Sequence, residues 1–173
     1  NKINQIFLIG QSGSGKTTIG KKLSKNLSFS FVDTDEYIEN KLKLTISEIF
    51  QTKGEAFFRD VEKRITLNIL KNKKGVIALG GGAFITRAIK NEVLENHLSF
   101  WLNWNIDTLI NRIRNSKKRP LAINSTKNEL IEIIKKRSII YSKALYKIDC
   151  ENFTKQQIAK KIIDNYETDK TNS

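Results

Sequence analysis

The feature that most constrains this chain is the segment from Gly10 to Thr17, which reads Gly-Gln-Ser-Gly-Ser-Gly-Lys-Thr. It matches the phosphate-binding loop pattern G-x-x-x-x-G-K-[ST]. The continuous apolar run at residues 5–9 predicts a buried strand before the loop, and apolar residues four apart at residues 16–27 predict a helix after it. This strand–loop–helix context is what the pattern needs, so we predict an α/β chain that binds a nucleoside triphosphate.

Each residue type in the loop has a chemical reason. Glycines let successive backbone N–H groups converge on phosphate oxygens, and the helix that follows points its positive end at the same place. Lys16 adds a point charge for the terminal phosphates, and the Thr17 hydroxyl is a ligand for Mg²⁺. The predicted ATP-binding residues of the loop are Gly13, Ser14, Gly15, Lys16, Thr17 and Thr18.

Four further short apolar segments predict strands at residues 29–32, 76–79, 98–102 and 146–149. Helices fill the gaps between them. Thr45, Thr126 and Thr154 each stand three residues before a Glu or Gln, which is the spacing of a capping box at a helix start. Alternating strands and helices predict a three-layer α/β/α protein with a five-stranded parallel sheet. We expect a single domain at residues 1–166 and a polar tail at 167–173.

Composition narrows the class of protein. The chain carries 31 Lys and Arg against 18 Asp and Glu, a net charge of +13, but its lysines are spread along the sequence without a basic tail. This distribution favours anionic small molecules over nucleic acid as partners. No apolar stretch is long enough to span a membrane, no signal-peptide pattern is present, and there is one cysteine. We therefore expect a cytoplasmic protein with neither a membrane nor a nucleic-acid partner.

Three polar clusters follow predicted strands or lie on a predicted helix. Asp33-Thr34-Asp35 can place one carboxylate near Mg²⁺ and the other near acceptor hydroxyls, or can simply cap a helix. Gly80-Gly81-Gly82 allows close approach to a ligand or a tight turn. Arg59 and Glu62 lie on one helical face, where they can be a functional pair or a surface ion pair.

A basic segment at residues 114–125 carries the only proline of the chain, Pro120, which disfavours a continuous helix there. A loop of this length in a compact domain is functional or merely solvated.

Taken together, these residues resemble the shikimate kinase family within the P-loop kinases related to nucleoside monophosphate kinases. The matching segments are Gly10–Thr17, Asp33–Asp35, residues 46–62 with the FRDVE motif, Gly80–Gly82, Arg119-Pro120-Leu121 and Arg137-x-x-x-Tyr141. The family implies transfer of the γ-phosphate of ATP to the 3-hydroxyl of shikimate, in the biosynthesis of aromatic amino acids, with one Mg²⁺ per active site.

The resemblance also implies roles for individual residues. Lys16, Asp35 and Arg119 would be catalytic, and Thr17 and Asp33 would lie at the metal. Arg59, Arg137, Gly81 and Gly82 would join Asp35 in binding shikimate, within acceptor-binding helices at residues 35–62. Arg112 would lie on the adenine side, and Arg119 would belong to a mobile lid at residues 114–125.

Two rival functions remain open from the sequence. Gluconate kinases and nucleoside monophosphate kinases share the phosphate-binding loop, and a catalytically silent loop protein that binds nucleic acid belongs to another class. We expect a monomer. His97, Cys150, Trp101 and Trp104 match no catalytic role and are expected to be packing or surface residues.

Overall fold

The computed structural model describes residues 5–116 and 124–172. Five strands form one parallel sheet in the order β2-β3-β1-β4-β5. The strands are β1 (Gln5–Ile9), β2 (Phe31–Asp33), β3 (Gly75–Ala78), β4 (Leu98–Asn103) and β5 (Tyr146–Asp149). All five predicted strands are confirmed, with ends that shift by up to two residues.

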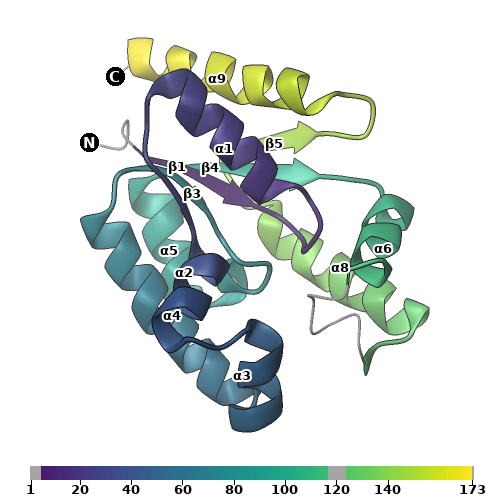
Figure 1. The fold of residues 1–173 in the computed structure, drawn as a ribbon. Coiled ribbons are helices and arrows are strands. Elements are labelled where there is room, and N and C mark those ends of the chain that lie inside the picture. The colour runs from purple at the N-terminus through teal and green to yellow at the C-terminus, as the bar shows by residue number, and fades with distance from the viewer. Residues whose placement is uncertain (1–4, 117–123, 173) are drawn as a thin grey trace.

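Helices cover both faces of the sheet (Figure 1). The first half contains α1 (Lys16–Leu27), α2 (Thr34–Leu42), α3 (Ile46–Lys53) and α4 (Glu55–Asn72). The second half contains the short η2 (Ala83–Ile85), α5 (Arg87–Asn96), α6 (Ile106–Arg114), α8 (Lys127–Tyr141) and α9 (Lys155–Thr171). The predicted three-layer arrangement is confirmed.

The alternating side chains of the strands explain the layers, as β1 illustrates. Ile6 and Leu8 pack into a cluster with residues of α1 and α9. Phe7 and Ile9 point to the other face and pack with residues of α4, α5 and α8. Because β1 is apolar on both faces, it lies at the centre of the sheet and places the loop that follows it at the carboxyl edge.

Two of the three predicted capping boxes are complete, at Thr45 and Thr154. At Thr126 the hydroxyl accepts the Glu129 amide, but the Glu129 carboxylate accepts a hydrogen bond from that hydroxyl instead of from the Thr126 amide. The third box is therefore only half formed.

At the C-terminus, α9 continues to Thr171, past the domain boundary that we predicted at residue 166. Tyr166 is buried in the core, and the Tyr146 hydroxyl donates to Asp169 at 2.8 Å. These tertiary contacts extend a helix that its polar composition alone does not predict. Most of the predicted lid, including Arg119, Pro120 and Leu121, lies outside the described residues.

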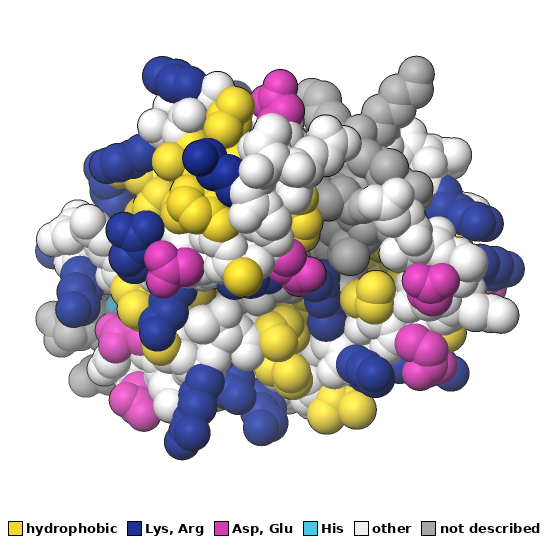
Figure 2. Space-filling view, turned by 90° about the horizontal axis from the view of Figure 1, so that it is seen from below, with side chains coloured by type: hydrophobic (Ala, Val, Ile, Leu, Met, Phe, Trp, Pro, Cys, Tyr) yellow, Lys and Arg dark blue, Asp and Glu magenta, His cyan; other side chains and the backbone are white. Residues whose placement is uncertain are grey.

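The face seen in Figure 2 carries Lys and Arg side chains in several separate groups, with Asp and Glu between them and apolar areas alongside. On this face the positive charge is therefore distributed, in agreement with the spread of lysines along the sequence. Among the described residues no helix is both long and apolar enough to cross a membrane.

Candidate active site

The phosphate-binding loop joins β1 to α1 at the carboxyl edge of the sheet. Gly15 has a φ of 84° at the start of α1, a left-handed conformation that glycine adopts without strain. The Lys16 ammonium donates to the carbonyl oxygens of Gly10 at 2.7 Å and Gln11 at 2.9 Å. Lys16 therefore lies across the loop, in the cavity that Gly13, Gly15, Thr17 and Thr18 also line.

Asp33 lies at the end of β2 and faces this cavity. Its Oδ1 caps α2 by accepting the amides of Asp35 at 2.9 Å and Glu36 at 3.1 Å. Its Oδ2 accepts the Thr17 hydroxyl at 2.5 Å. The capping interpretation of the acidic pair is thus correct for one oxygen, and the other oxygen is held beside the loop.

The Thr17 and Asp33 oxygens suit Mg²⁺, which prefers hard oxygen ligands and keeps several waters. Within residues 5–116 and 124–172 no group of three or more His, Cys, Asp or Glu side chains could hold a metal. An ion at this corner would need oxygens from phosphate and water, which is how Mg²⁺ binds with nucleotides.

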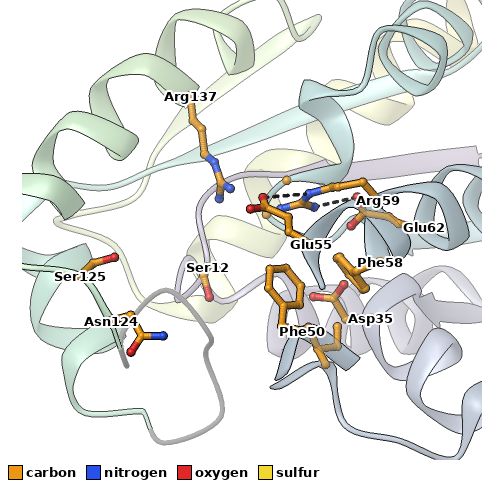
Figure 3. Close-up of a pocket in the computed structure, with 13 residues that line it drawn as sticks. Ser12, Asp35, Phe50, Glu55, Phe58, Arg59, Glu62, Asn124, Ser125 and Arg137 are labelled. Atoms are coloured by element: carbon orange, nitrogen blue, oxygen red, sulfur yellow. Dashed lines mark hydrogen bonds and ion pairs between the residues drawn. The ribbon is translucent and has the colours of Figure 1, made fainter. Parts of the chain in front are cut away.

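A second cavity of about 250 Å³ adjoins the first one. The residues labelled in Figure 3 surround it from opposite sides, with Arg137 reaching in from α8 and Arg59 from α4. Asp35 lies at the start of α2, and Phe50 and Phe58 form an apolar wall. Asp35 also lines the first cavity, so this carboxylate lies between the two.

Acidic partners fix the position of Arg59. Its Nη1 donates to Glu62 Oε1 at 2.8 Å, and its Nε lies 3.7 Å from Glu55 Oε1. The Glu62 side chain is only 1% exposed, so this pair is not the surface ion pair that we considered. Burial raises the pKa of Glu62, and the neighbouring Arg59 opposes that rise. Glu62 therefore orients the guanidinium of Arg59, and both side chains line the cavity.

The glycine triplet follows β3 and supports the same cavity. The Gly80 amide donates to the Thr34 hydroxyl at 3.0 Å, and the Gly81 carbonyl accepts the Tyr141 hydroxyl. A Cβ at Gly82 would overlap the Arg59 guanidinium. Gly82 therefore has no side chain for a packing reason, since that space belongs to Arg59.

Electrostatics distinguish Asp35 from ordinary carboxylates. Burial first, and then the nearby charges of Asp33 and Glu62, raise the pKa of Asp35 to about 7, while Lys16 opposes the rise. A carboxylate with a pKa near neutrality can hold a proton or release it at physiological pH, which suits a group that accepts a proton during a reaction.

The structure brings together most residues that the sequence singled out. Asp35, Arg59, Gly81, Gly82 and Arg137 line the acceptor-side cavity. Ser14, a residue of the loop, is fully buried. Arg112 donates to the Gly13 carbonyl at 3.1 Å. Arg119 lies outside the described residues, so its position stays a prediction.

Some residues of the acceptor-side cavity had been given no role of their own, although each lies in a segment that the sequence singled out: Ser12, Phe50, Glu55, Asn124 and Ser125. Tyr141 belonged to the family motif with Arg137, and the structure adds that its hydroxyl donates to the Gly81 carbonyl. Cys150 is buried and burial raises its pKa to about 12, which fits the expected packing role. Trp104 also packs against the core, but in addition its indole contacts the loop.

A phosphate-binding loop beside a polar cavity with two arginines and a carboxylate defines a P-loop kinase of small molecules. The family model for shikimate kinase matches residues 12–167. Shikimate kinase from Bartonella henselae is 38% identical over 159 residues, covering 91% of this chain and 76% of that protein. The enzyme from Thermodesulfovibrio yellowstonii is 37% identical over 95% of this chain and 96% of its own length. The chain belongs to the shikimate kinase family.

Solved structures agree. Shikimate kinase from Acinetobacter baumannii in complex with shikimate superposes with a TM-score of 0.90 at 29% identity, covering 97% of this chain and 95% of that chain. Shikimate kinase from Aquifex aeolicus superposes with a TM-score of 0.84 at 30% identity, covering 95% of this chain and 97% of that chain. A gluconokinase from Sinorhizobium meliloti superposes with a TM-score of 0.56 at 12% identity, covering 97% of this chain and 94% of that chain. At this identity the similarity is one of fold alone.

Proposed function

We propose that this protein transfers the γ-phosphate of ATP to the 3-hydroxyl of shikimate, giving shikimate 3-phosphate and ADP. The observation that carries the proposal is the pair of adjoining cavities that share Asp35. One cavity contains the phosphate-binding loop. The other contains two arginines that can bind a substrate carboxylate, beside the Asp35 carboxylate that can accept hydrogen bonds from substrate hydroxyls. Shikimate carries a carboxylate and hydroxyls on one ring.

Arg59 and Arg137 bind the shikimate carboxylate. Their planar guanidinium groups can donate two parallel hydrogen bonds to a planar anion, which lysine cannot do. Glu62 and Glu55 hold Arg59 in place before the substrate arrives. Gly81 and Gly82 form the floor, where their lack of side chains leaves room for both the substrate and Arg59.

Asp35 accepts a hydrogen bond from the attacking hydroxyl and orients it toward the loop. As the new oxygen–phosphorus bond forms, the hydroxyl proton passes to Asp35 and the bond from the γ-phosphorus to the bridging oxygen of ADP breaks. Lys16 and Arg119 stabilise the charge on the transferring group. Thr17 and Asp33 would hold Mg²⁺, which neutralises phosphate charge when it is bound.

The proposal also covers the state and the surroundings of the protein. The protein acts as a monomer in the cytoplasm, where ATP is available, and takes neither nucleic acid nor membrane as a partner. The chain folds as one domain, and the segment at residues 114–125 closes over the bound substrates.

A coupled ADP-release assay tests the proposal. Purified protein is given Mg-ATP and, in separate reactions, shikimate, gluconate or a nucleoside monophosphate, with the K16A variant as the inactive control. We expect release with shikimate only. ADP release with gluconate alone would show that gluconate is the substrate instead of shikimate. No ADP release with any acceptor would support a catalytically silent protein that binds nucleic acid.

A further inference from the structure

Trp104 contacts the phosphate-binding loop from a position that no part of the loop motif includes. It follows β4 directly and precedes α6. Its indole Nε1 donates to the Ser14 carbonyl at 2.8 Å. The ring is half-buried. It packs against the apolar cluster that contains Ile6 and Leu8 of β1, and also against a second apolar cluster between α6 and α8. The indole is therefore held by packing while its single donor points at the loop.

Arg112 extends this contact to the preceding peptide. It comes from α6, and its guanidinium carbon lies 4.0 Å from the centroid of the Trp104 ring. Its Nη1 donates to the Gly13 carbonyl at 3.1 Å. Two successive carbonyl groups of the loop are thus bound by two side chains that stack on each other.

Binding these carbonyls orients the loop amides. A peptide group is planar, and its C=O and N–H point in opposite directions. When the Ser14 carbonyl is held toward Trp104, the Gly15 N–H must point away from Trp104, and Gly15 lines the donor cavity. Amides of this kind bind phosphate oxygens in such loops.

The other end of the loop is tied to α8. The Gln11 side chain is buried and donates from Nε2 to the Ile134 carbonyl of α8 at 3.0 Å. The loop is therefore attached to α8 through Gln11, to α6 through Arg112, and to the segment between β4 and α6 through Trp104. Without these contacts, the four peptide groups that link Gln11 to Gly15 would have more freedom to rotate.

We propose that Trp104 is a positioning residue for nucleotide binding, which orients the Gly13–Gly15 peptides and carries Arg112. The inference rests on the proposed function only in taking a nucleotide as the loop's ligand, and it does not depend on the acceptor. The loop glycines supply freedom of rotation, and Trp104 removes that freedom again. The binding of phosphate then costs less ordering of the loop.

The test compares three variants at the two tryptophans, Trp104 and Trp101. W104F keeps an aromatic ring but removes the N–H donor, and W104L also removes the face on which Arg112 stacks. W101F is the matched control, since Trp101 is more deeply buried and its ring contacts Tyr141 and Lys147. The measured quantity is the affinity for ADP in MgCl₂, by isothermal titration calorimetry, alongside the melting temperature.

We expect W104F to bind ADP about two- to tenfold more weakly, as the loss of one hydrogen bond predicts. W104L should lose about another two- to fivefold because the cation–π contact is lost as well. W101F should bind ADP with unchanged affinity, whatever it does to the melting temperature. Binding of shikimate should be the same in all three variants.

Fluorescence gives a second measurement. In W101F the only indole is Trp104, so titration with ADP should change its emission and titration with shikimate should not. W104F binding ADP as tightly as the parent would overturn the proposal, as would W101F weakening ADP binding equally or the absence of an ADP-dependent change in emission. If the parent protein fails to phosphorylate shikimate but these ADP results hold, the proposed acceptor is wrong and the role of Trp104 stands.

Discussion

The two adjoining cavities are built in different ways. The donor cavity is formed largely by one continuous segment, Ser12 to Thr18, with Asp33 and Asp35 across from it. The acceptor-side cavity takes its residues from the loop, α2, α3, α4, the glycine triplet, the end of the basic segment and α8. Local backbone conformation makes the first, and the packing of distant helices makes the second. Changes on the acceptor side should therefore leave nucleotide binding intact.

The largest effect should come from D35N, because Asp35 belongs to both cavities. Asparagine has nearly the same shape but cannot take the hydroxyl proton, so we expect kcat to fall by about 10²- to 10⁴-fold. The affinity for ADP, measured by calorimetry, should stay within about twofold of the parent, since most of its binding groups lie in the loop. A D35N enzyme with nearly normal kcat would remove Asp35 from proton transfer.

The next largest effect should come from R59A, which should impair the binding of shikimate and not the binding of ATP. It removes charged hydrogen bonds to the substrate carboxylate, so KM for shikimate should rise about ten- to a hundredfold while KM for ATP holds. R64A is the matched control, because Arg64 is on the same helix but is 68% exposed and pairs with the exposed Asp60. An equal rise of KM for shikimate and for ATP in R59A would contradict the assignment of Arg59 to the substrate carboxylate.

G82A tests the close packing of the glycine triplet on Arg59. Gly82 has a φ of −93°, which alanine also adopts, so the added methyl should act only by displacing the guanidinium. We expect KM for shikimate to rise about tenfold, as misplacement of a binding group by a fraction of an ångström can cause.

A double-mutant cycle identifies the route of this effect. In an R59A background the G82A change should add little, because the displaced group is already gone. If the two effects simply multiply, Gly82 acts on the substrate directly and not through Arg59.

The smallest effect concerns stability and pH. Because the pKa of Asp35 is raised to about 7 in the folded protein, ionising it there opposes folding. This cost is fully present above about pH 7, decreases as the pH falls toward the unfolded value, and is absent below about pH 4. In EDTA, D35N should therefore melt about 2–6 °C higher than the parent at pH 8 and show a smaller gain at pH 5. An equal gain at both pH values would show that ionisation is not the cause.

Parts of this protein could be predicted because their signals are local. The loop from Gly10 to Thr17 is recognisable since its chemistry depends on consecutive backbone amides, and β1 is recognisable since burial on both faces requires a continuous apolar run. The complete capping boxes at Thr45 and Thr154 are equally local.

Other parts could not be predicted from the residues themselves. That Arg59 and Arg137 face one cavity came from a family resemblance, because nothing in the spacing of α4 and α8 fixes how these helices meet. The buried state of Glu62 also depends on that packing, and so does the extension of α9 to Thr171. Trp104 gave no signal at all, since an indole after a strand is ordinary in a core.

The donor side of this protein follows from its sequence alone, since the order of glycines, lysine and threonine along one turn dictates where the amides, charge and hydroxyl converge. How that loop is held, and what lies opposite it, depends on the tertiary structure. Trp104 and Arg112 bind loop carbonyl groups from elements far away in sequence, and the loop's own Gln11 side chain binds α8. The physical reason is range: backbone conformation is set by neighbours along the chain, whereas the orientation of side chains across a cavity is set by the close packing of whole helices.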